Sequence, residues 1–248
     1  MTSPPDSRKR VFDIEMQGQP DDASCGPTCL QAVYRYFGDD IALDDLISQV
    51  QHLEGGGTLA VNLANHALRR GYSALIYTYN LTVFDPSWFE GRPVDLDERL
   101  RAQAKAKRSR KLAEATEAYL EFLGLGGELE MEDLTPGLLR RWLGEDRPLL
   151  TGLSSTFLYR TPREVGTDTL ADDDVRGVPT GHFVVLCGWD PEERAVRIAD
   201  PYAENPRFQR HIYWLPVERV INSILLGVLT YDANILLLAP PAGKDTSS

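Results

Sequence analysis

The residues best suited to chemistry lie in one short stretch, QPDDASCGPTC, at positions 19–29. Cys25 opens a Cys-Gly-Pro triplet, and small or apolar residues then recur at helical spacing. Because proline is tolerated in the first turn of a helix, the pattern places Cys25 at a helix N-terminus, with Asp22 or Ser24 as the side-chain cap. The unpaired backbone N–H groups and the positive end of the helix dipole favour a thiolate there, and a thiolate attacks carbonyl carbon.

Partners for such a nucleophile occur before and after it. Gln19 lies on the incoming turn, where its amide and the Cys25 backbone N–H could donate to an oxyanion. His182 begins an apolar run, and Asp200 ends a second one before a proline. A turn at 190–193 makes the two runs a predicted β-hairpin, and centring it on Pro191 places His182 directly opposite Asp200. The carboxylate would then orient the imidazole, although a slip of one residue would separate them.

These three blocks resemble the C39-like peptidases, papain-fold cysteine peptidases related to the domains that trim bacteriocin leaders. The matching features are Gln19 followed by Cys-Gly-Pro, His182 opening a strand, and Asp200 before proline, and they span roughly residues 17–202. The resemblance implies an α+β fold in which an N-terminal helical part carries the nucleophile and packs on an antiparallel sheet carrying His and Asp. It also implies a Cys25-His182-Asp200 triad with Gln19 in the oxyanion hole, a peptide or amide substrate, and no metal or organic cofactor.

The chain of 248 residues is compatible with one such domain. We expect a disordered tail over 1–10, a single domain over 11–240 with a helical insertion at about 93–145, and a disordered tail over 241–248. In the middle, 95–123 has the composition of a charged helical hairpin. The polar stretch 161–180 is expected to be a long unstructured loop beside the cleft. Its aspartates at 168 and 172–174 would favour basic substrates.

The overall charge argues against two classes of partner. The formal net charge is −11, which disfavours binding to nucleic acid or to anionic membranes, and no apolar run is long enough to span a bilayer. A basic run over 99–111 lacks interleaved aromatic residues and is better explained as a solvated helix face. The three cysteines form no disulfide framework, so a reduced, cytoplasmic setting is expected. The sequence gives no indication of oligomeric state.

Several alternatives stay open at this level. Cys25, Cys29 and Cys187 with His182 could be proposed as a zinc set, but the Cys-x2-Cys spacing of structural zinc sites is missing. His211 is a rival for the general base. An acyltransferase or transpeptidase would form the same thioester and release it to an amine, and a non-catalytic peptide-binding domain could keep the fold alone.

Overall fold

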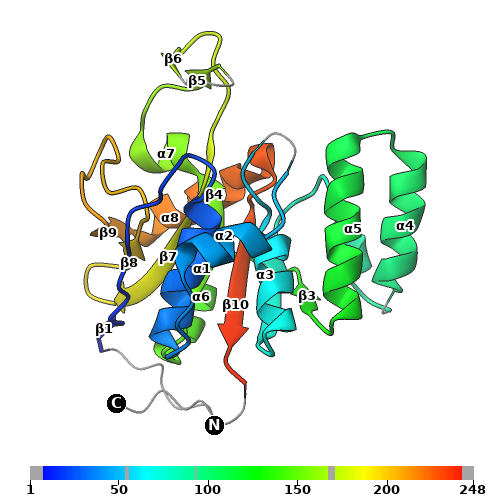
Figure 1. The fold of residues 1–248 in the computed structure, drawn as a ribbon, viewed down its shortest axis with the longest axis horizontal. Helices are drawn as coiled ribbons and strands as arrows, with labels where there is room; N and C mark the ends of the chain where they lie inside the picture. Colours follow the sequence, from blue (N-terminus) through cyan, green and yellow to red (C-terminus); the bar gives the residue numbers. More distant parts are fainter. Residues whose placement is uncertain (1–7, 54–55, 93, 167–170, 242–248) are drawn as a thin grey trace.

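The structure is a computed structural model that describes residues 8–53, 56–92, 94–166 and 171–241. Its centre is a mixed sheet in the order β3-β2-β10-β4-β7-β8-β9, with β1 paired to β7 (Figure 1). All neighbouring strands are antiparallel except β2 and β3. The strands are β1 Arg10–Val11, β2 Ser73–Thr78, β3 Glu128–Glu130, β4 Leu149–Ser154, β7 Gly181–Asp190, β8 Ala195–Ala199, β9 Ile212–Pro216 and β10 Asn234–Ala239.

Helices cover both faces of this sheet. In Figure 1, α1 (Cys25–Tyr36), α2 (Leu43–Gln49) and α3 (Ala60–Arg69) lie in front of it, and α8 (Val217–Leu226) lies behind. The helix α6 (Pro136–Gly144) contacts β7, and α7 (Ser155–Tyr159) contacts α8. The apolar run that begins at His182 is explained by this layering, because nearly every residue of β7 is buried. The expected α+β arrangement, with a helix carrying Cys25 packed on a largely antiparallel sheet, is therefore confirmed.

The middle of the chain forms a helical hairpin at the side of the sheet. It consists of α4 (Leu96–Ala106) and α5 (Arg110–Gly124), and α5 packs against α3. Side chains cap both helices: Asp95 accepts from Glu98 N, and Ser109 accepts from Leu112 N. The remainder of the expected insertion is integrated with the sheet, because β3 pairs with β2 and α6 contacts β7.

Two expectations about loops need correction. The stretch 161–180 is not without structure, because β5 (Glu164–Val165) and β6 (Ala171–Asp172) pair as a small hairpin that projects beyond the sheet (Figure 1). Position 168 lies outside the described residues. Arg10, which was expected to belong to the N-terminal tail, lies in β1 and pairs with Trp189 of β7. The expected tails at 1–7 and 242–248 also lie outside the described residues.

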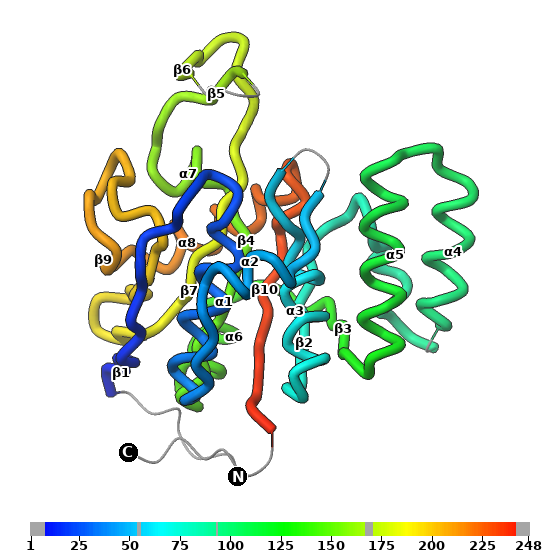
Figure 2. The backbone as a smooth tube through the Cα atoms, viewed as in Figure 1, coloured from blue at the N-terminus to red at the C-terminus, as the bar shows by residue number. Residues whose placement is uncertain are grey.

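One hydrophobic core joins the N-terminal and C-terminal parts of the described chain. It includes residues from Phe12 to Leu238 and contains side chains of α1, α3, α5, α8 and the central strands. The segment between β1 and α1 runs along one side of the molecule and turns into α1 at the end where the β5–β6 hairpin projects (Figure 2). No helix in the described part of the chain combines the length and the apolar composition needed to cross a bilayer.

Candidate active site

Cys25 is the first residue of α1, as the sequence predicts, but the predicted side-chain cap is wrong. Ser24 occupies the N-cap position without a capping hydrogen bond, and its hydroxyl donates to Asp21 Oδ1 at 2.7 Å. The same carboxylate oxygen accepts from Ala23 N at 2.9 Å, which makes an Asx turn just before the helix. The first N–H groups of a helix have no intrahelical partner, so without a side-chain cap they stay available beside the Cys25 thiol.

The Cys-Gly-Pro triplet is explained by close packing. A Cβ added at Gly26 would lie 2.7 Å from Thr58 Cγ2 and 3.3 Å from both Leu63 Cδ1 and Phe183 Cδ2. Only glycine lets the first turn of α1 approach the start of α3 and the strand β7 this closely. The triplet therefore places Cys25 against the strand that carries His182.

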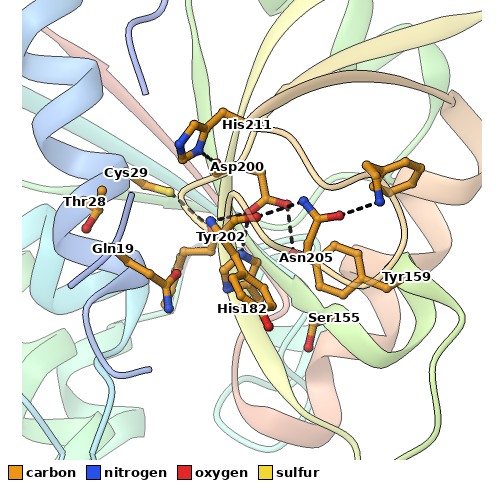
Figure 3. A network of polar contacts seen from close by, with 12 residues as sticks. Gln19, Thr28, Cys29, Ser155, Tyr159, His182, Asp200, Tyr202, Asn205 and His211 are labelled. Carbon is orange, nitrogen blue, oxygen red and sulfur yellow. Dashed lines mark hydrogen bonds and ion pairs between the residues drawn. The ribbon is translucent and has the colours of Figure 1, made fainter. Parts of the chain in front are cut away.

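His182 and Asp200 meet in a hydrogen bond of 2.9 Å between Nε2 and Oδ1 (Figure 3). Both side chains are buried, with His182 7% and Asp200 0% exposed. The predicted cross-strand register is wrong, because Val185 pairs with Ala199, and continuing that register places Asp200 opposite Val184. His182 lies two residues further along the strand, on the same face, and reaches the carboxylate diagonally.

A β-bulge makes this contact possible. Near the turn, Gly188 pairs with Arg197, and that register would bring Asp200 opposite Val185, on the other face from His182. The register shifts by one residue between Leu186 and Gly188, which returns Asp200 to the face of His182. No motif in the sequence indicates this bulge.

Asp200 accepts three further hydrogen bonds. The Tyr159 and Tyr213 hydroxyls donate to Oδ2 at 2.8 and 2.5 Å, and the Tyr202 backbone N–H donates to Oδ1 at 2.9 Å. Burial raises the pKa of Asp200, but His182, Tyr213 and the Tyr202 N–H outweigh it and hold the pKa below its usual value. The carboxylate is therefore kept ionised inside the protein. Sequence reasoning missed both tyrosines, because neither belongs to a motif.

The electrostatics of His182 favour its protonated form. Burial lowers its pKa, but the charge and hydrogen bond of Asp200, followed by a hydrogen bond with Cys25, bring the pKa up to about 10. With Nε2 bonded to Asp200, the remaining ring nitrogen, Nδ1, is the one available to Cys25. His182 can therefore hold a proton for transfer within the site.

Gln19 is held close to these residues. Its backbone N–H donates to Pro201 O at 3.0 Å, directly after Asp200 in the sequence. One N–H of its side-chain amide donates to Asp21 O at 2.9 Å, and the second remains for another acceptor. Its Oε1 is buried and has no hydrogen-bond partner within the described residues. Figure 3 shows the Gln19 side chain on the same side of the network as His182.

The residues considered as a rival base or as zinc ligands have different surroundings. His211 Nδ1 donates to the backbone oxygen of Asp200 at 2.6 Å, so this ring contacts the main chain and lies across Asp200 from His182 (Figure 3). Cys29 Sγ donates to Phe183 O at 3.3 Å, and burial raises the pKa of its thiol. Burial also raises the pKa of Cys187, to about 12. Across the described ranges, no three or more His, Cys, Asp or Glu side chains are grouped to hold a metal ion.

Comparison with known proteins found matches only among solved structures, since no family model and no curated protein matches the chain. A Bacillus anthracis protein assigned as a C39-like peptidase is 15% identical, with a TM-score of 0.47, over 94% of this chain and 98% of that one. A double-glycine-motif protease from an AMS/PCAT transporter, in complex with the leader peptide, is 14% identical, with a TM-score of 0.43, over 94% and 99%. Xylellain, a cysteine protease from Xylella fastidiosa, is 15% identical, with a TM-score of 0.41, over 95% and 85%.

Proposed function

We propose that this protein is a cysteine peptidase or amide hydrolase of the C39-like type, with Cys25 as nucleophile and His182 as general base and acid. The observation that carries the proposal is the buried pair of His182 and Asp200, 2.9 Å apart between Nε2 and Oδ1, on the sheet against which α1 packs with Cys25 as its first residue. Asp200 fixes the ring and stabilises the imidazolium, and Gln19 with the Cys25 N–H receives the oxyanion. The substrate is a peptide or another amide.

The reaction follows from these positions. The Cys25 thiolate attacks the amide carbonyl carbon, and the negative charge moves to the carbonyl oxygen, next to the free N–H groups. As the C–N bond breaks, imidazolium His182 gives its proton to the departing amine, which leaves a thioester on Cys25. His182, now neutral, takes a proton from water, whose oxygen attacks the thioester carbon, and the C–S bond breaks to release the carboxylic acid and the Cys25 thiolate beside imidazolium His182.

Selective labelling of the three thiols tests the nucleophile. Brief treatment of the native protein with iodoacetamide, followed by mass spectrometry, should label Cys25 at least about tenfold faster than Cys29 or Cys187, whose raised pKa values leave little thiolate. His182→Ala should slow labelling of Cys25, and unfolding the protein should equalise the three. Equal labelling in the native protein would contradict the proposal.

Product analysis then tests the reaction. A peptide library digested with the protein should give new C-termini that disappear with Cys25→Ala. Repeating the digestion with a large excess of glycine amide separates hydrolysis from acyl transfer, because a transferase would give amide-linked products. A thiol that labels selectively without any Cys25-dependent product would point to the non-catalytic binding domain.

A further inference from the structure

A pocket lined by apolar and cationic side chains lies next to the candidate active site. It has a volume of about 360 Å³ and lies among α7, the segment after it, Pro179 and the end of α8. Phe157, Leu226 and Leu229 supply apolar surface, and Arg160 and Arg163 supply charge. Leu226 and Leu229 are 38% and 63% exposed, so their side chains are open to a ligand. We call this the arginine pocket.

The charge of this region opposes that of the chain. The Arg160 guanidinium lies 4.0 Å from the centre of the Phe157 ring, and that of Arg219 lies 5.9 Å from it. Burial lowers the pKa of Arg219, and the nearby charges of Arg160 and Arg207 lower it further. In the part of the chain that the structure describes, no carboxylate pairs with Arg160, Arg207 or Arg219.

Near the pocket, the guanidiniums of Arg160, Arg207 and Arg219, without a carboxylate partner among the described residues, form a local positive field in a chain of net charge −11. Guanidinium groups recognise carboxylates through paired N–H donors and also stack on aromatic faces. A ligand for the arginine pocket therefore needs an anionic group beside an apolar one, and an acidic residue next to an apolar residue in a peptide meets both requirements.

The arginine pocket is joined to the active site through α7. Ser154, at its edge, pairs with Gly181, the residue before His182, and Thr180 N donates to Thr156 Oγ1 at 3.0 Å. Tyr159, which donates to Asp200, immediately precedes Arg160. One short helix thus supports the catalytic carboxylate and forms a wall of the pocket.

We infer that the arginine pocket is a substrate subsite of the proposed peptidase, selecting peptides in which an apolar residue adjoins an aspartate or glutamate near the scissile bond. This inference rests on the proposed function, and it reverses the preference expected from the acidic stretch 161–180. In that stretch the Asp173 carboxylate pairs with Arg176 at 2.6 Å, which offsets the charge of this one aspartate. Of the two arginines that line the pocket, Arg163 donates to Asp174 O and lies near the Asp173 carboxylate, whereas Arg160 has no carboxylate partner among the described residues.

Binding of a matched pair of dyes tests the pocket without any catalysis. The anionic dye 8-anilinonaphthalene-1-sulfonate and the uncharged N-phenyl-1-naphthylamine share their aromatic rings and differ in the sulfonate. Arg160→Gln should weaken binding of the sulfonate about tenfold, as loss of one charge-assisted contact implies, and leave binding of the amine unchanged. Arg108→Gln, at an exposed position between α4 and α5, is the matched control and should change neither. Equal sulfonate binding by wild type and Arg160→Gln would overturn the inference.

Cleavage profiles test the subsite itself. In the peptide library, sites cut in a Cys25-dependent manner should be enriched in Asp or Glu at one fixed position, and Arg160→Glu should abolish that enrichment whereas Arg108→Glu should keep it. Cleavage without an acidic preference, or with the same preference in Arg160→Glu, overturns the subsite and leaves the proposed function standing. Absence of Cys25-dependent cleavage overturns the proposed function and with it the role of the pocket in catalysis, while the dye result still decides whether the pocket binds anions.

Discussion

The two halves of the candidate site differ in how completely their polar groups are bonded. On the sheet side, Asp200 is fully buried and accepts hydrogen bonds from His182, Tyr159, Tyr213 and the Tyr202 N–H. A buried carboxylate is costly unless it is paired and hydrogen-bonded, and here those partners hold it ionised. This half is complete without a substrate.

On the helix side, hydrogen-bonding capacity is left over. Ser24 does not cap α1, so the N–H groups next to Cys25 stay open. Gln19 retains one amide N–H, and its Oε1 is buried without a partner among the described residues. An unsatisfied buried polar group costs about 1–3 kcal/mol, and an arriving amide could remove that cost. In the proposed mechanism, the base is therefore organised by the protein itself, and the nucleophile side is completed by the substrate.

The largest expected effect is at the base. His182→Ala should lower Cys25-dependent peptide cleavage by roughly 10⁴–10⁶, because one member of a catalytic unit carries most of its effect. His211→Ala should cost less than about tenfold, since the His211 ring hydrogen-bonds the backbone oxygen of Asp200 rather than its carboxylate. Circular dichroism of both variants verifies the fold. An active His182→Ala with an inactive His211→Ala would show that the base is misassigned.

A smaller effect on catalysis is expected at Gln19, on the helix side of the site. Gln19→Ala should reduce kcat by about 10²–10³, the usual cost of losing one oxyanion donor, with little change in KM. The matched control is Gln17→Ala, two residues earlier, whose side-chain oxygen accepts from Arg35 Nη1 at 3.4 Å. If the two variants have equal kcat, Gln19 does not donate to the oxyanion.

The smallest expected effect is on the free energy of unfolding, at the Asp200 half of the site. Tyr213→Phe keeps the ring stacked on Phe208, 4.0 Å away between centroids, but removes the hydroxyl that donates to Asp200. Unfolding with urea at pH 7 should show a loss of about 1.5–3 kcal/mol, the range for a hydrogen bond to a charged group.

The pH dependence gives this prediction its sign. The Tyr213 hydroxyl helps to lower the pKa of Asp200, so its contribution is present above the unfolded value of about 3.9 and is lost as the pH falls through the lower folded value. The difference between wild type and Tyr213→Phe should therefore shrink at acidic pH. Tyr202→Phe keeps the backbone N–H that Asp200 accepts and should show no such trend. A difference that is constant with pH would mean that the hydroxyl acts through packing alone.

Much of the fold and the candidate site could be predicted because the determining interactions are local. The Cys-Gly-Pro triplet and the helical spacing after it set where α1 begins, and the apolar run from His182 indicated a buried strand. The α4–α5 hairpin followed from the same kind of periodicity. Each of these features depends on residues a few positions apart, so its signal is present in the sequence.

Only the tertiary structure decided how these pieces meet. The contact between His182 and Asp200 requires a bulge that shifts the register of β7 and β8, and a bulge depends on pairing between strands. Tyr159 and Tyr213 reach Asp200 from 41 and 13 residues away in the sequence, and Arg160 and Arg219 converge on one aromatic ring from separate helical segments. The sequence therefore determined which residues stand at the start of the helix and of the strand. Packing decided their partners, because hydrogen bonds and charge contacts between distant segments leave no periodic signal along the chain.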